Sequence, residues 1–140
     1  MARKSVKRIQ VAFALAERRG KYLICQRSRG THLAGYWEFP GGKRKPFETW
    51  EACLRREIRE ELGVSLRDVR PFTRLRYRYP GRFISFKVFR CRMAGSPKVL
   101  PLQRFQWIGA SRLRRFRFPP VDRDLIDLLA CAGRNKRAIM

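Results

Sequence analysis

Five carboxylates gather in one short stretch of a strongly basic chain. The sequence holds 34 Lys and Arg against 11 Asp and Glu, which gives a formal net charge of +23. Five of the eleven acids lie between positions 48 and 61: Glu48, Glu51, Glu57, Glu60 and Glu61. On a helix, residues three and four apart share a face, so Glu57 would lie beside Glu60 and Glu61. Three neighbouring carboxylates need positive charge among them, and such oxygen ligands suit Mg²⁺ or Mn²⁺.

A second interpretation of these acids needs no metal. Arg side chains on the same helix could neutralise them, for example Arg55 against Glu51 one turn away. Exposed ion pairs of this kind are common on solvated helices and contribute little to stability. Charge alone does not decide between a metal-binding face and a salt-bridged face, so both interpretations stay open at this point.

The segment before the expected helix favours the metal-binding interpretation. Gly41 and Gly42 predict a turn in which the backbone can approach a ligand closely and offer a carbonyl oxygen. Glu48 lies near the helix start, where the helix dipole favours a carboxylate. Arg56 follows eight residues later and could return across the loop to pair with Glu48. Such a pair would hold the loop against the helix and keep the carboxylate face rigid.

Strands and a second helix are expected around this segment. The carboxylate helix is expected over 49–62 and ends at Gly63, because glycine is favoured just past a helix C-terminus. Apolar and alternating patterns predict strands over 9–15, 22–27, 74–79, 83–92 and 105–108, and a last helix over about 121–131. Hairpins dominate this order, so the predicted fold class is α/β (α+β), with a mixed β-sheet sandwiched between helices. The length predicts a single domain, 1–140.

The composition excludes several classes of protein. Hydrophobic residues make up 44% of the chain and aromatic residues 12%, which is too rich for a disordered segment. No apolar run approaches the roughly 20 residues of a membrane span, so no membrane partner is expected. The four cysteines form no C-x-x-C pair, which predicts free thiols in a reducing cytosol and a cytoplasmic location. The basic charge fits general solubility, attraction of a nucleotide, or nucleic-acid binding.

Nine residues of the acidic region match a known signature. They are Gly42, Glu48, Arg56, Glu57, Ile58, Glu60, Glu61, Gly63 and Val64. Their types and spacing resemble every defined position of the Nudix box: Gly, five residues, Glu, seven residues, then Arg-Glu-aliphatic-x-Glu-Glu-x-Gly-aliphatic. The chain is therefore similar to Nudix hydrolases, and specifically to the MutT type. Segments 37–43, 79–84 and 118–122 are also similar to that type. The resemblance implies a Nudix fold over most of the chain.

The resemblance also implies an activity. MutT-type Nudix hydrolases use Mg²⁺ or Mn²⁺ to convert a nucleoside triphosphate to the monophosphate and pyrophosphate, with water attacking the β-phosphorus. Acting on 8-oxo-dGTP or dGTP, such an enzyme would sanitise the nucleotide pool. A divalent cation would neutralise the triphosphate, and a carboxylate on the same face would take a proton from the attacking water.

Individual roles are carried over only from this resemblance. The catalytic residues would be Glu48, Arg56, Glu57, Glu60 and Glu61, with Glu57 as the general base and Arg56 paired with Glu48. The metal ligands would be Glu57, Glu60, Glu61 and the carbonyl of Gly42. The substrate-binding residues would be Arg27 at a phosphate, Phe39 and Tyr79 beside the base, and Arg82 and Asp122 near the base edge. For Arg27 an ordinary surface role is the alternative, and for the two aromatic residues a core role.

Three departures from the MutT pattern bear on the substrate and the site. Asp122 stands where MutT-type enzymes have Asn, and because an ionised Asp only accepts hydrogen bonds, cytidine triphosphates become an alternative to 8-oxo-dGTP. Segment 94–106 lacks the further Glu that many members supply, and Gln103 is the nearest polar candidate there. Pro46-Phe47 replaces the Gly that commonly precedes the box Glu, which predicts a changed loop and an intact site.

Two further functions stay open on the sequence alone. A non-catalytic nucleic-acid-binding Nudix module would explain the +23 charge and the missing loop acid, although such a module has no need for an intact box. A Nudix enzyme acting on a nucleotide sugar or a dinucleoside polyphosphate is the other alternative, because a fold does not define its substrate.

Overall fold

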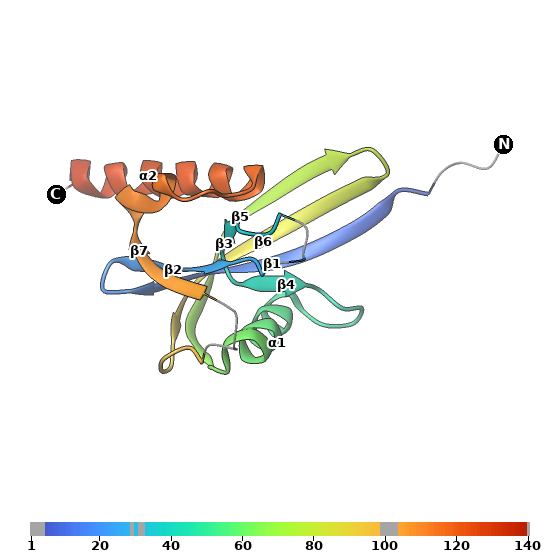
Figure 1. The fold of residues 1–140 in the computed structure, drawn as a ribbon, viewed down its shortest axis with the longest axis horizontal. Helices are drawn as coiled ribbons and strands as arrows, with labels where there is room; N and C mark the ends of the chain where they lie inside the picture. The colour runs from blue at the N-terminus through green and yellow to red at the C-terminus, as the bar shows by residue number, and fades with distance from the viewer. Residues whose placement is uncertain (1–4, 29, 31–32, 99–103, 140) are drawn as a thin grey trace. The chain divides into compact units, whose positions relative to one another are not determined.

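The computed structural model describes residues 5–28, 30, 33–98 and 104–139, with the backbone alone for 132–139. The chain divides into two compact units, one of residues 1–16 and 40–98 and one of residues 17–39 and 99–140. In chain order, the elements of the described part are β1 (Lys7–Arg18), β2 (Lys21–Gln26), β3 (Trp37–Glu38), β4 (Gly41–Lys43), α1 (Trp50–Leu62), β5 (Leu66–Tyr79), β6 (Arg82–Met93), β7 (Arg104–Gly109), the 3₁₀-helix η1 (Ala110–Arg115) and α2 (Pro120–Ile139) (Figure 1). The prediction of a single domain over 1–140 is not decided by this division and stays a prediction.

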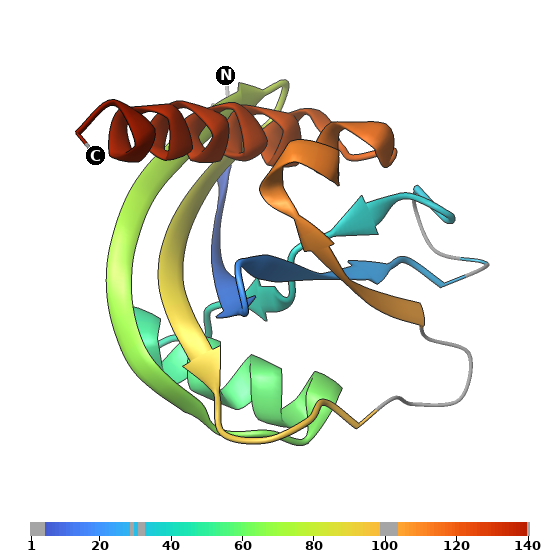
Figure 2. The same cartoon turned by 90° about the vertical axis from the view of Figure 1, so that its left-hand side faces the viewer.

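In the first unit, β1 lies between two strands of a mixed sheet. It pairs in parallel with β6, from Lys7 opposite Arg82 to Ala16 opposite Cys91. It also pairs antiparallel with β4, where Ala12 lies opposite Gly42. Strands β5 and β6 form a long antiparallel hairpin and run side by side in both views (Figures 1 and 2). The predicted mixed sheet is therefore present in this unit.

Strand β5 is longer than the sequence predicts, because its first half does not alternate cleanly. It begins at Leu66, eight residues before the expected start at Arg74. Its register with β6 shifts between Arg67 and Arg70 and again between Pro71 and Thr73. β-bulges of this kind interrupt the two-residue period on which strand prediction depends, and Pro71 further weakens the pattern.

Helix α1 confirms the expected carboxylate helix. Thr49 caps its N-terminus, because the Thr49 Oγ1 accepts a hydrogen bond from the Ala52 N–H at 3.0 Å. Gly63 ends the helix in the left-handed conformation, with φ of 64°. The buried side chains of the helix are Cys53, Leu54, Ile58 and Leu62. The helix contacts β4 and β5 within this unit.

The expected turn at Gly41 and Gly42 is instead the short strand β4. Its pairing with β1 brings the two backbones so close that a Cβ at position 41 would overlap the carbonyl oxygen of Ala12. Only glycine fits there. The two glycines therefore do mark a close approach of the backbone, as expected from the sequence. The group that approaches at Gly41 is the backbone of strand β1.

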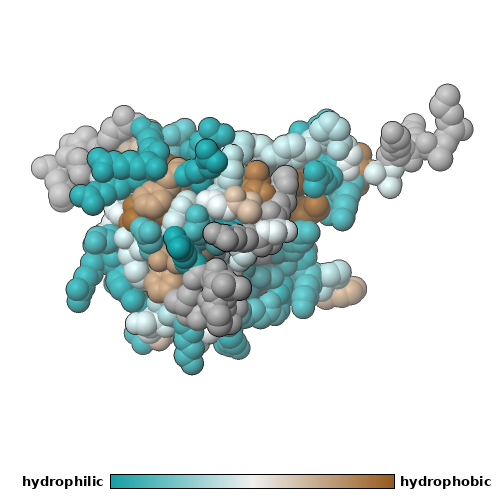
Figure 3. Space-filling model, viewed as in Figure 1, coloured by the Kyte–Doolittle hydropathy of each residue, from teal (hydrophilic) through white to brown (hydrophobic). Residues whose placement is uncertain are grey.

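The second unit is built on β2, which pairs antiparallel with β7 and with β3. The end of β1 pairs with the start of β2 across the turn at Arg19 and Gly20. Helix α2 continues to Ile139, beyond the apolar residues from which its end was predicted at about 131. Among the described residues, no helix has the length and apolar content needed to span a membrane. Hydrophilic residues form most of the coloured surface in Figure 3, in keeping with the high charge.

Candidate active site

The loop between β4 and α1 places Glu48. Phe47, just before it, has a φ of 68° and a fully exposed side chain. This left-handed conformation is the one that glycine adopts at least cost, so Phe47 takes up the backbone shape that a Gly would favour. The Lys45 N–H donates to Glu48 Oε1 at 2.8 Å and closes the loop. The loop is therefore formed with Pro46-Phe47 in place of the Gly that commonly precedes the box Glu, and Glu48 still lies at the start of α1.

Arg56 is the centre of the site in the first unit. Its Nη2 donates to Glu48 Oε1 at 2.6 Å and its Nε donates to Glu48 Oε2 at 3.0 Å, which forms a two-pronged ion pair. Its Nη1 donates to Glu57 Oε1 at 2.9 Å and lies 3.3 Å from Glu60 Oε2. Its Nη2 also donates to the Lys43 carbonyl at 3.0 Å and so ties β4 to α1. The predicted Arg56–Glu48 pair is confirmed, and the same guanidinium contacts two further acids of the helix.

This network changes the protonation equilibria of its members. Hydrogen bonds from Arg56 lower the pKa of Glu48 to about 2, and the bonds to Glu48 in turn raise the pKa of Arg56 above its ordinary value. Burial raises the pKa of the Cys53 thiol to about 11, with the Glu48 charge adding to the effect. The protonated Cys53 Sγ donates to the Gly42 carbonyl at 3.6 Å. Sequence reasoning did not assign Cys53 to the site, although its position three residues before Arg56 on the helix could have indicated it.

Gly42 lies directly against the carboxylate of Glu57. A Cβ at position 42 would overlap the Cδ and both oxygens of that carboxylate, so glycine leaves the room that Glu57 occupies. The side chain of Glu57 is 17% exposed and that of Glu60 is 55% exposed, while Glu61 is half-buried. Carboxylate and carbonyl oxygens are the donors that hard divalent cations prefer. The donor set and the glycine contact therefore fit Mg²⁺ or Mn²⁺.

The side chains themselves adopt the salt-bridged arrangement. Within the described part of the chain, no three His, Cys, Asp or Glu side chains already form a group that could hold a metal ion. Arg56 instead neutralises the inner acids, and Arg55 Nη2 lies 3.3 Å from the exposed Glu51 Oε1, as the alternative interpretation expected. The structure therefore brings Glu48, Glu57 and Glu60 together around a guanidinium.

Three predicted substrate-binding residues belong to the second unit: Arg27, Phe39 and Asp122. Arg27 Nη1 donates to Glu38 Oε2 at 2.9 Å, and burial raises the pKa of Glu38 although Arg27 opposes this. The ring of Phe39 is 1% exposed and stacks on Phe118, with centroids 5.7 Å apart. The structure thus shows a core position for the Phe39 ring.

Asp122 is almost completely buried in this unit, with 1% exposure. The Phe39 N–H donates to its carboxyl group, while within the described residues its Oδ1 has no hydrogen-bond partner. Burial, and then the charge of Glu38, raise the pKa of Asp122 to about 8. The raised pKa favours the neutral form of Asp122, in contrast to the ionised form considered from the sequence. Glu38 was not singled out from the sequence, although it lies in the segment that resembles the MutT approach to the box.

Tyr79 and Arg82 lie opposite each other at the tip of the β5–β6 hairpin in the first unit. Tyr79 is 39% exposed and its ring lies 6.4 Å from that of Tyr77, so it offers an accessible aromatic surface. Segment 94–106 is described at 94–98 and 104–106, and the candidate Gln103 lies outside the described residues.

A model of the NUDIX domain matches residues 6–129 of the chain. This chain belongs to the Nudix family. The predicted membership of the family is thereby confirmed, and with it the class of enzyme, a hydrolase. Nudix proteins typically depend on a divalent metal, which agrees with the oxygen donor set of Gly42 and the helix acids.

Similar proteins extend this assignment. The Nudix chain is 34% identical over 123 residues to a Haemophilus influenzae protein named 8-oxo-dGTP diphosphatase, covering 86% of this chain and 90% of that protein. Over 59 residues it is 49% identical to the Escherichia coli CTP pyrophosphohydrolase, covering 42% and 44% of the two chains. The solution structure of the E. coli ORF135 protein matches with a TM-score of 0.79 and 30% identity, covering 90% of this chain and 91% of that one. The predicted Nudix fold, a mixed β-sheet with flanking helices, is confirmed.

Proposed function

We propose that this Nudix protein is a Mg²⁺-dependent nucleoside triphosphate pyrophosphohydrolase. It converts 8-oxo-dGTP or dGTP to the monophosphate and pyrophosphate and so removes damaged nucleotides from the pool. The observation that carries the proposal is the arrangement around Arg56, which holds Glu48 and Glu57 together while Gly42 leaves room for the Glu57 carboxylate. Similarity over 90% of the H. influenzae 8-oxo-dGTP diphosphatase supports the choice of substrate.

The residues of α1 take distinct roles in this proposal. Glu57, Glu60, Glu61 and the carbonyl of Gly42 would hold Mg²⁺ or Mn²⁺, which supplies positive charge to the triphosphate. Glu57 is the general base that accepts the proton of the attacking water, and Arg56 orients it through the 2.9 Å hydrogen bond to Oε1. Glu48 keeps Arg56 in place, and its low pKa keeps that pair ionised at physiological pH.

Four residues are proposed to recognise the nucleotide: Arg27 at a phosphate, Tyr79 beside the base, and Arg82 and Asp122 near the base edge. The ring of Phe39, 1% exposed and stacked on Phe118, stays in the core and is not assigned to the base. A protonated carboxyl offers one O–H donor and one acceptor, as the amide of Asn does. Because the pKa of Asp122 is raised to about 8, this residue can substitute for the Asn of MutT-type enzymes, which favours an 8-oxo-purine.

A cytidine triphosphate is the second candidate substrate. The stretch of 59 residues that is 49% identical to the E. coli CTP pyrophosphohydrolase favours it. An ionised Asp122 would only accept, for example from the amino group of cytosine, whereas the protonated form would also donate to a carbonyl oxygen of an 8-oxo-purine. The state of Asp122 therefore separates the two substrates.

The test is pyrophosphate release from 8-oxo-dGTP, dGTP, dCTP, CTP and ATP with Mg²⁺. We expect the fastest release from 8-oxo-dGTP, and we expect the Asp122→Asn variant to keep that preference. Preference for CTP or dCTP would support the second candidate. A folded protein that releases no pyrophosphate from any of these nucleotides, with Mn²⁺ tried as well, would reject the proposal and favour a non-catalytic module or another diphosphate substrate.

A further inference from the structure

One face of the sheet in the first unit collects positive side chains. Three rows of directly paired residues cross β1, β6 and β5: Arg8–Phe83–Arg78, Gln10–Ser85–Arg76 and Ala12–Lys87–Arg74. Residues that lie directly opposite each other project from the same face of a sheet. Arg44, just after β4, joins this face because its Nη1 donates to Gln10 Oε1 at 2.6 Å. We call Arg8, Arg44, Arg74, Arg76, Arg78 and Lys87 the basic sheet face.

The charges of the basic sheet face are not compensated by acids. Segments 5–16 and 69–98 of this unit contain no Asp or Glu. Across the described residues, none of the six cations forms an ion pair with a carboxylate. Arg74 even lies opposite Lys87, and like charges in this position destabilise a sheet. Folding does not benefit from this placement, whereas binding of an anion does.

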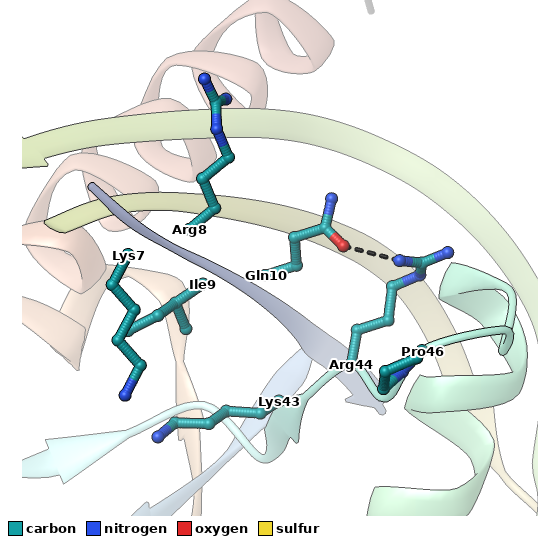
Figure 4. A pocket seen from close by; sticks show the side chains of 7 residues that line it. All are labelled: Lys7, Arg8, Ile9, Gln10, Lys43, Arg44 and Pro46. Atoms are coloured by element: carbon teal, nitrogen blue, oxygen red, sulfur yellow. Dashed lines mark hydrogen bonds between the residues drawn. The ribbon is translucent and has the colours of Figure 1, made fainter. Parts of the chain in front are cut away.

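Two hollows lie beside residues of this face, and Gln10 lines both of them. The first, of about 370 Å³, is lined in part by Lys7, Arg8, Lys43 and Arg44 (Figure 4). The second, of about 130 Å³, is lined in part by Trp50, Arg74, Arg76 and Lys87. Figure 4 shows the hydrogen-bonded side chains of Gln10 and Arg44, with Lys7 and Ile9 pointing to the opposite side of β1 from Arg8. The second hollow therefore lies along the basic sheet face, and the first reaches from it to the other side of β1.

Aromatic rings hold several of these cations in place. The guanidinium of Arg8 lies 5.7 Å from the ring centroid of Phe83, and that of Arg78 lies 5.9 Å from it. Arg44 lies 5.6 Å from the ring of Trp50, and its buried Nε has no hydrogen-bond partner in the described part of the chain. An arginine that rests on a ring keeps its N–H groups available for an anion.

We propose that the basic sheet face binds the backbone of single-stranded nucleic acid. Alternate arginines on β5 repeat about every 6.8 Å along the strand, which suits a ligand with regularly repeated phosphates. Five of the six cations are Arg, whose planar fork matches phosphate oxygens. Among the described residues the exposed large hydrophobic side chains are Val6, Phe47, Tyr79 and Leu128, which are too few and too scattered along the chain to suit a membrane. This binding is additional to nucleotide hydrolysis and does not rest on it.

The test compares two triple variants by fluorescence anisotropy with a labelled oligothymidylate of about 16 nucleotides. Arg74→Gln/Arg76→Gln/Arg78→Gln removes three charges from the basic sheet face. The matched control, Arg67→Gln/Arg70→Gln/Arg92→Gln, removes three exposed charges from the same two strands but from the other face. We expect the first variant to weaken binding at least tenfold and to lower the log–log salt slope by about 2, and the control to weaken binding less than about threefold.

Several outcomes would overturn the proposal. Absence of binding by the wild-type chain, or equal loss in the two triple variants, would show that no specific face is used. Tighter binding of a duplex, or equal binding of polyglutamate, would show that the ligand is not a single strand. Should the first triple variant fail to fold, Phe83→Leu serves instead, with a severalfold loss expected and no loss overturning the proposal. Glu57→Gln, which tests hydrolysis, should bind the oligonucleotide as the wild type does, so failures of the two proposals are distinguishable.

Discussion

Glu48 in the first unit and Asp122 in the second carry the same acidic group, yet their surroundings differ. Glu48 receives two hydrogen bonds from Arg56 and one from the Lys45 N–H, and its pKa falls to about 2. Asp122 is buried with an unpartnered Oδ1, and its pKa rises to about 8. At neutral pH the first group is therefore a charge that holds an arginine, and the second is a neutral donor and acceptor.

This difference shows that neighbours, more than residue type, define what a carboxyl group can do. In a chain of net charge +23, an acid beside Arg56 is expected to be ionised. Asp122 is the exception, because Phe39 and the start of α2 exclude water and no cation approaches closely enough to reverse the effect. A charged cluster around Arg56, for which catalysis is proposed, and a buried acid with a raised pKa, for which base recognition is proposed, thus occur in one Nudix chain.

The largest effect is expected from breaking the ionised cluster at its proposed base. Glu57→Gln should lower kcat by at least about 100-fold, because the amide cannot accept the proton of the attacking water. The measurement is pyrophosphate release at saturating Mg²⁺. Glu51→Gln on the same helix is the matched control, because Glu51 is exposed and pairs with Arg55, and it should retain nearly full activity. Equal activity in the two variants would contradict the role of Glu57.

Substitutions of the adjacent glycines should have different effects: on catalysis at Gly42 and on stability at Gly41. Gly42→Ala places a Cβ against the movable Glu57 carboxylate, so kcat should fall about tenfold while the melting temperature changes little. Gly41→Ala places a Cβ against the Ala12 backbone, which cannot move aside, and should destabilise the fold by about 4 kcal/mol. Thermal unfolding and kinetics of both variants check this prediction, and an equally stable, inactive Gly41→Ala would contradict it.

The opposite pKa shifts predict opposite pH dependences of stability. Asp122 has a raised pKa, so its stabilising contribution is complete below about pH 3.8 and is lost as pH rises through about 8. Glu48 has a lowered pKa, so its contribution is present above about pH 4.5 and is lost as pH falls toward 2. The melting temperature of the wild type should therefore fall between pH 6 and pH 9. In Asp122→Asn this fall should be about 5 °C smaller. An unchanged pH dependence in this variant would show that Asp122 does not titrate there.

The smallest effect is expected at Phe47, next to Glu48. The left-handed φ of 68° strains a residue that has a Cβ, and the exposed ring makes no compensating contacts. Phe47→Gly should raise the free energy of unfolding by up to about 1 kcal/mol, since part of the relieved strain is offset by backbone entropy. Denaturant unfolding measures this change, and Phe47→Ala, which keeps the Cβ, is the control. A destabilised Phe47→Gly would contradict the assignment of strain.

The sequence predicts the parts of this molecule that depend on local spacing. The helix over 49–62, its end at Gly63 and the pairing of Arg56 with Glu48 all follow from residues that are close along the chain. The parallel pairing of β1 with β6 and the first half of β5 do not, because they depend on distant partners and on bulges. The burial of Asp122 likewise depends on how α2 packs near Phe39, which no local pattern contains.

The acids of α1 around Arg56 are proposed to catalyse the release of pyrophosphate from 8-oxo-dGTP. The most direct measurement identifies the products of 8-oxo-dGTP with Mg²⁺, for the wild-type chain and for Glu57→Gln. We expect 8-oxo-dGMP and pyrophosphate from the wild type and almost no product from the variant. Release of orthophosphate with 8-oxo-dGDP, or equal product from both proteins, would contradict it.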